Sequence, residues 1–80
     1  MGFAGYVKEL RVKKGVSQLD VAKRLGFTTC QLVSNIERGL SLYPVDKLKK
    51  VSEILDCDPK VILEMYIQEK ADKIRKKSKI

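Results

Sequence analysis

The chain has 80 residues, of which 17 are Lys or Arg and 10 are Asp or Glu, giving a formal net charge of +7. A chain of this length forms one small domain that buries only about 60% of its unfolded surface. Its positive charge favours a polyanionic partner, either nucleic acid or an acidic membrane surface. No apolar run approaches the roughly 20 residues that a membrane-spanning helix needs.

The sequence contains no histidine, and its two cysteines, Cys30 and Cys57, lack CxxC spacing. This composition excludes the usual zinc-binding sets and acid–base chemistry on an imidazole. It also lacks a phosphate-binding glycine loop and a nucleophile elbow, so we expect neither an enzyme nor a cofactor site. We see no signal peptide and therefore expect a cytoplasmic protein with reduced thiols, while a Cys30–Cys57 disulfide stays open as the alternative.

Hydrophobic spacing predicts five helices and no strand, which makes the chain all-α. The predicted helices cover residues 3–14, 17–25, 29–37, 44–55 and 58–72. The first of them turns an apolar face to the core and ends at Gly15. The side chains of that face are Tyr6, Val7 and Leu10.

The second helix begins at a capping box in which Ser17 is the N-cap and Asp20 the third helical residue. Val16 and Val21 flank this start as a hydrophobic staple. Gly26 ends the helix, because glycine readily adopts the positive φ that the turn needs. The side chains expected to point inward are Leu19, Ala22 and Leu25.

The third helix is predicted to have Thr29 as its N-cap and to end at Gly39. With that start, Val33 and Ile36 fall on the buried side. The side chains expected on the outer face are Cys30, Gln31, Ser34 and Asn35.

The last two predicted helices each have a proline at the start. Pro44 begins the fourth helix, and Pro59 is the first helical residue of the fifth. The buried stripe expected on the fourth helix is Val45, Leu48, Val51, Ile54 and Leu55. Asp58 caps the fifth helix, which we expect to fray past Asp72. We therefore divide the chain into a folded domain, residues 1–69, and a basic tail, residues 70–80.

The spacing of residues 18, 22, 26, 33 and 36, together with the exit VSNIERG at 33–39, resembles the helix-turn-helix of the Cro/repressor-type (XRE-like) family. The resemblance runs from Tyr6 to Met65. It implies a lambda-repressor-like domain that binds specific double-stranded DNA as a transcriptional regulator, with repression as the expected effect. In this chain Phe27 and Thr28 separate Gly26 from the predicted cap, which makes the turn one residue longer than usual in the family.

The resemblance also implies where DNA binds, with the recognition helix 29–37 in the major groove. The base-contacting candidates are Gln31, Asn35, Leu32 and Cys30. The phosphate-contacting candidates are Gln18, Thr28, Thr29, Ser34, Arg38, Ser41 and Lys47. In the family an Arg of the first helix pairs with the Glu that ends the third, and Arg11 and Glu37 occupy those places.

We expect a homodimer that binds a palindromic operator with half-sites about 34 Å apart. The fifth helix is apolar over more than one face, and its predicted dimer contacts are Ile62, Met65 and Tyr66.

Several residues have plainer alternative interpretations. Gln31 and Asn35 could be ordinary solvated side chains, Leu32 a packing residue and Cys30 an incidental small side chain. The tail 70–80 could be a disordered solubilising end or a non-specific phosphate arm.

Alternatives also exist for the function as a whole. The chain could be a phage or mobile-element regulator, a restriction–modification controller, or an antitoxin that binds a toxin as well as DNA. It could also be a protein-interaction module that keeps the fold without reading DNA. An amphipathic membrane-surface helix over residues 59–80 is disfavoured, since its apolar residues precede the charges rather than oppose them.

Overall fold

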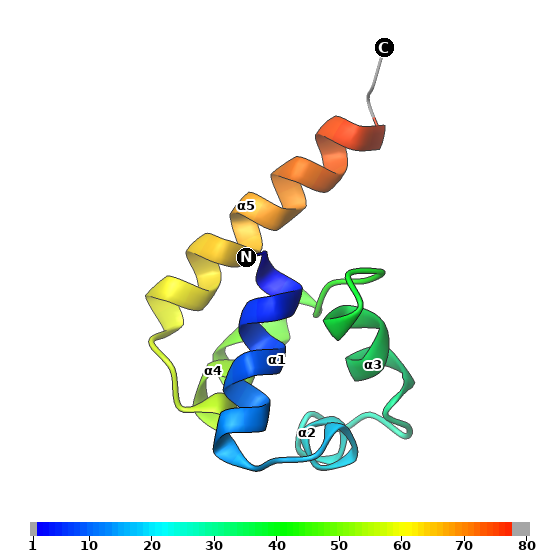
Figure 1. The fold of residues 1–80 in the computed structure, drawn as a ribbon, viewed down its shortest axis with the longest axis vertical. Helices are drawn as coiled ribbons and strands as arrows, with labels where there is room; N and C mark the ends of the chain where they lie inside the picture. Colours follow the sequence, from blue (N-terminus) through cyan, green and yellow to red (C-terminus); the bar gives the residue numbers. More distant parts are fainter. Residues whose placement is uncertain (1, 78–80) are drawn as a thin grey trace.

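The computed structural model describes residues 2–77, with side chains described as far as Ile74. Its elements are α1 (Phe3–Lys14), α2 (Gln18–Arg24), α3 (Gln31–Glu37), the 3-10 turn η1 (Val45–Lys47), α4 (Leu48–Leu55) and α5 (Pro59–Lys77). Helices α1 to α4 gather around one core, and the C-terminal half of α5 extends away from them (Figure 1). The described residues contain no strand, so the predicted all-α, five-helix domain is confirmed.

Three predicted helix ends are confirmed by their hydrogen bonds. Gly15 follows α1 with φ of 73°, and its N–H donates to the carbonyls at the end of that helix. The Ser17 hydroxyl accepts the N–H of Asp20 at 3.0 Å, which caps α2. The Asp58 carboxylate accepts the N–H of Lys60 at 2.9 Å, so it caps α5 just before Pro59.

The third helix begins one residue later than predicted: its N-cap is Cys30 and its first helical residue is Gln31, whereas Thr29 was the predicted N-cap. The first carbonyl to accept an intrahelical bond is that of Cys30, which receives the N–H of Ser34 at 3.0 Å. The Thr29 hydroxyl still accepts the N–H of Gln31, at 3.3 Å. Thr29 therefore contributes a capping bond from one residue upstream of the structural N-cap, Cys30.

The last two helices also differ from the prediction. Pro44 has an extended backbone with ψ of 139°, and residues 45–47 form η1 before α4 begins at Leu48. Helix α5 continues without a break to Lys77, so the prediction that it frays past Asp72 is wrong. Residues 78–80 of the predicted basic tail lie outside the described residues.

All five α-helices contribute to the hydrophobic core. Its members are Phe3, Val7, Val21, Ala22, Leu25, Val33, Ile36, Tyr43, Leu48, Val51, Ile54, Leu55, Ile62 and Tyr66. The Phe3 ring meets those of Tyr43 and Tyr66 edge-on, with centroids 6.3 and 5.6 Å apart. Edge-to-face contacts of this kind are a favoured aromatic geometry. They join the start of the chain, the segment after α3 and α5 in one cluster.

Two residues predicted to point inward are exposed instead. Leu19 is 46% exposed, and Val21 takes the buried place on α2. The core-facing positions of α2 are 21, 22 and 25, which lie on one helical face, and position 19 lies outside that face. Val45 is 62% exposed because it belongs to η1 and not to the helical face of α4.

Two further expectations concern a disulfide between the cysteines and a helix that spans a membrane. Cys30 and Cys57 are both free thiols and both half-buried, so the alternative of a disulfide between them does not apply to this structure. No helix within residues 2–77 is long and apolar enough to cross a membrane.

Burial in the core raises the pKa of the Tyr43 phenol above its usual value of 10.0, and the charge of Glu37 acts in the same direction. Above about pH 10 the unfolded chain loses this proton while the folded chain keeps it, so we expect the free energy of unfolding to fall. In Tyr43→Phe, which keeps the ring in the core, the fall should be less steep. Urea unfolding at several alkaline pH values measures this, and equal slopes in the two proteins would contradict the argument.

Candidate nucleic-acid interface

The turn between α2 and α3 is built from a glycine and a core-packing aromatic. Gly26 has φ of 84°, a conformation that strains a residue with Cβ. The next residue, Phe27, packs against the core, and its N–H donates to the carbonyl of Ala22 at 2.9 Å. The longer turn is therefore anchored to α2 by a hydrogen bond and to the core by a side chain.

Helix α3 is fixed by two fully buried side chains on its inner face, Val33 and Ile36. On its outer face Gln31 is exposed and Asn35 is half-buried. The amide nitrogen of Gln31 donates to the side-chain oxygen of Asn35 at 3.1 Å. The two side chains thus lie on one face of α3 and point toward each other, and the Gln31 oxygen and the Asn35 amino group take no part in this bond. An amide side chain can bind adenine through N6 and N7, so either residue carries the chemistry of a base reader.

The two apolar candidates for base contact have a different environment. Leu32 and Cys30 are half-buried, and both pack against the hydrophobic core. The structure thus agrees with the plainer interpretation of Leu32 as a packing residue.

The predicted phosphate contacts come from elements on both sides of α3. Thr28, Thr29 and Arg38 are exposed, in the turn before α3 and at its end. The remaining candidates are half-buried; they are Gln18, Ser34, Ser41 and Lys47. The Gln18 amide also donates to the Glu37 carboxylate at 3.1 Å, so it has a structural partner inside the chain.

The Arg11–Glu37 ion pair joins α1 to the end of α3. Arg11 donates to Glu37 twice, from Nε at 2.7 Å and from its terminal nitrogen at 3.0 Å, and a third nitrogen donates to the carbonyl of Val16 at 2.8 Å. The side chains of the pair are only 14% and 3% exposed. The hydrogen bond to Glu37 is the main cause that raises the pKa of the Arg11 guanidinium. A bidentate pair of this kind fixes the relative orientation of two helices.

Two of the three predicted dimer contacts belong to the core of the chain itself. Ile62 is 1% and Tyr66 5% exposed, and the Tyr66 hydroxyl donates to the carbonyl of Tyr43 at 2.9 Å. They cannot meet a partner without unpacking the core, so this part of the prediction is wrong. Met65 is half-buried. The exposed apolar side chains of α5 are Val61, Leu63, Ile67 and Ile74.

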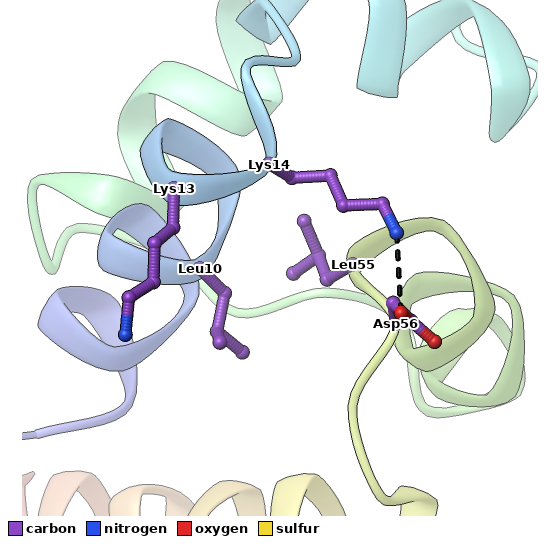
Figure 2. A pocket seen from close by; sticks show the side chains of 5 residues that line it. All are labelled: Leu10, Lys13, Lys14, Leu55 and Asp56. Atoms are coloured by element: carbon purple, nitrogen blue, oxygen red, sulfur yellow. Dashed lines mark ion pairs between the residues drawn. The ribbon is translucent and has the colours of Figure 1, made fainter.

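Two clefts open to solvent lie between other helices. One is lined by Arg24, Lys50, Glu53 and Ile54. The other lies where α1 and α4 end and is lined by Leu10, Lys13, Lys14, Leu55 and Asp56, with an exposed Lys14–Asp56 ion pair of 3.3 Å across it (Figure 2). Neither cleft is lined by a residue of α3, so both are separate from the candidate DNA-reading face.

We expect Arg11→Met to lower the free energy of unfolding by about 3 kcal/mol, because it leaves the Glu37 carboxylate buried without its cation. Adding Glu37→Gln should recover part of the loss, since the buried charge is then gone. The matched control is Lys14→Met, which breaks an exposed ion pair and should cost at most about 1 kcal/mol. Urea unfolding measures all three, and an Arg11 variant as stable as the control would refute this account.

Comparison with known proteins agrees with this geometry. A family model described as helix-turn-helix matches residues 7–62, which is most of the chain and includes α2, the turn and α3. The match supports a Cro/repressor-type, XRE-like domain, a class of DNA-binding regulators rather than enzymes. No curated protein and no solved structure matches the chain. The family match and the arrangement of α2 and α3 lead to one conclusion: the chain belongs to the Cro/repressor-type family of helix-turn-helix DNA-binding regulators.

Proposed function

We propose that the protein is a transcriptional repressor that binds a specific double-stranded DNA sequence with α3 in the major groove. The observation that carries this proposal is the Gln31–Asn35 pair on the outer face of α3. It places two amide side chains on the face opposite the buried residues Val33 and Ile36. Amide side chains read adenine through two hydrogen bonds, and each good bidentate contact discriminates by about 1–3 kcal/mol.

Polar groups around α3 support binding to the DNA backbone on both sides of the groove. The exposed residues Thr28 and Thr29 precede the helix, and Arg38 follows it. Contacts of hydroxyl and guanidinium groups with phosphates set the register of a protein on the duplex and carry no sequence information directly. In this proposal the amide pair supplies specificity and the flanking residues supply position.

We further propose a homodimer formed through α5, on a different face from the one that the sequence predicted. Leu63, Ile67 and Ile74 are exposed and spaced by four and seven residues, which places them on one side of the helix. These three side chains are 42%, 57% and 55% exposed, so this apolar face is accessible to a second copy. The C-terminal half of α5, which carries Ile74, extends beyond the other helices (Figure 1). A two-fold axis would then present two copies of α3 to a palindromic operator.

Replacing both amides, in Gln31→Ala and Asn35→Ala, should reduce the preference for the selected operator over random duplex by about 1–3 kcal/mol per contact. The operator is first selected with the wild-type chain from a random duplex library, and affinities are then measured at fixed salt. Gln68→Ala is the matched control, since Gln68 is an exposed glutamine on α5 whose amide donates to Asp72. Unchanged preference in the double variant would refute base reading by these two amides, whereas failure of the wild-type chain to select any operator would favour a protein-interaction module.

Ile67→Glu should convert the dimer into a monomer, because two copies would each bury an unpaired carboxylate in the interface. Size-exclusion chromatography with light scattering measures the mass, with and without DNA. Val12→Glu is the control: Val12 is 59% exposed on α1, close to the 57% of Ile67. A wild-type chain that is monomeric at tens of micromolar in both conditions would contradict the homodimer.

A further inference from the structure

Helix α5 contacts the rest of the domain through one face that continues well past its apolar part. Ile62, Tyr66, Glu69 and Lys73 are spaced by four, three and four residues, the spacing of side chains on a single helical face. Ile62 and Tyr66 fill the core. Glu69 and Lys73 replace apolar packing with polar contacts, so the docked face extends into the region that composition alone assigns to a basic tail.

Each of the three polar side chains on this face bonds main-chain atoms far away in the sequence. The Tyr66 hydroxyl donates to the carbonyl of Tyr43 at 2.9 Å. The Glu69 carboxylate accepts the N–H of Phe3, at the start of α1, at 3.3 Å. The Lys73 ammonium donates to the carbonyl of Gly39 at 2.9 Å. Two of the three partners lie in the connection between α3 and η1, the segment that leaves the recognition helix.

The Lys73 contact lies just beyond the C-terminal end of α3, where Arg38 is the C-cap residue. The C-terminal end of a helix carries a partial negative charge, which basic residues in the last turn normally offset. The last turn of α3 contains no basic residue, and it ends with the acidic Glu37. Arg11 from α1 pairs with the Glu37 carboxylate. Lys73 from α5 brings a further positive charge from outside α3 to the carbonyl of Gly39, two residues beyond Glu37.

The turn at Gly39 determines how α3 ends. Its φ of 80° allows the N–H of Gly39 to donate to Ile36 and the N–H of Leu40 to Asn35, at 3.1 and 2.8 Å. These two bonds close the last turn of the helix that carries the candidate base reader Asn35. A group that hydrogen-bonds the Gly39 carbonyl therefore helps to fix the position of the outer face of α3.

We propose that α5 is a strap across the exit of the recognition helix, and that Lys73 is a positioning residue for DNA binding through its bond to Gly39. The DNA part of this inference rests on the proposed function, whereas the strap itself does not. Lys73 therefore acts as part of the folded domain, although it lies in the predicted basic tail, residues 70–80. It acts on DNA through α3 and not through a phosphate.

Three variants of the full chain test the proposal. Lys73→Met removes the donor and keeps the aliphatic stem, while Lys73→Arg keeps a donor of similar reach. Lys60→Met is the matched control, because Lys60 is an exposed lysine on the same helix and loses the same charge. Two measurements are made: hydrogen exchange of the Gly39 and Leu40 amides by NMR without DNA, and affinity for the wild-type-selected duplex as a function of salt.

In Lys73→Met we expect both amides to exchange about three- to tenfold faster, the factor that corresponds to one net hydrogen bond. Affinity should fall by a similar factor with an unchanged salt dependence, and Lys73→Arg should restore both. Equal exchange in Lys73→Met and Lys60→Met would overturn the strap. Unchanged exchange with a salt slope smaller by about 0.9 would instead identify Lys73 as a phosphate ligand. If the wild-type chain binds no DNA, the proposed function fails, and the exchange measurement still decides on the strap.

Discussion

Glu37 ends the recognition helix with a carboxylate that is almost completely buried, with 3% of its side chain exposed. Two effects destabilise a carboxylate at this position: burial disfavours its charge, and the negative end of the helix repels it. The chain offsets both costs with donors from other helices, two bonds from Arg11 on α1 and one from Gln18 on α2. Helix α3 can therefore end as it does only when α1 and α2 are already in place. A single charged group thus ties the orientation of the reading face to the rest of the bundle.

The aromatic cluster of Phe3, Tyr43 and Tyr66 fixes the far end of the segment that follows α3. Phe3 begins α1, Tyr43 closes the connection after α3, and Tyr66 lies in the middle of α5. Their edge-on contacts bring together three segments that are distant in the sequence. The segment after α3 is consequently held at Glu37 by polar bonds and at Tyr43 by apolar packing. Flexibility in the part of the chain that leaves the recognition helix is limited at both of its ends.

Much of this architecture could be predicted from the sequence, because it depends on local signals. The caps at Ser17 and Asp58 and the turn glycines identify helix ends without tertiary information, and the family pattern pointed to the Arg11–Glu37 pair. The start of α3 was harder, since adjacent threonines offer competing caps in a turn of unusual length. On α5, apolar residues occupy more than one face, so the sequence could not tell which of them meet the core. The role of Lys73 was hidden by composition, but its seven-residue spacing from Tyr66 was a signal that a longer predicted helix would have used.

Helices α2 and α3 have seven residues each. Isolated helices shorter than about 12–15 residues are marginal in water, so neither has much stability of its own. The part of the chain that we propose faces DNA therefore depends on packing against α1, α4 and α5 for its shape, and a peptide of residues 17–39 alone would be mostly unstructured. Loss of the reading face and loss of the fold are then one cooperative event. Any variant that weakens the core reduces the population able to bind DNA, even when every residue on the outer face of α3 is intact.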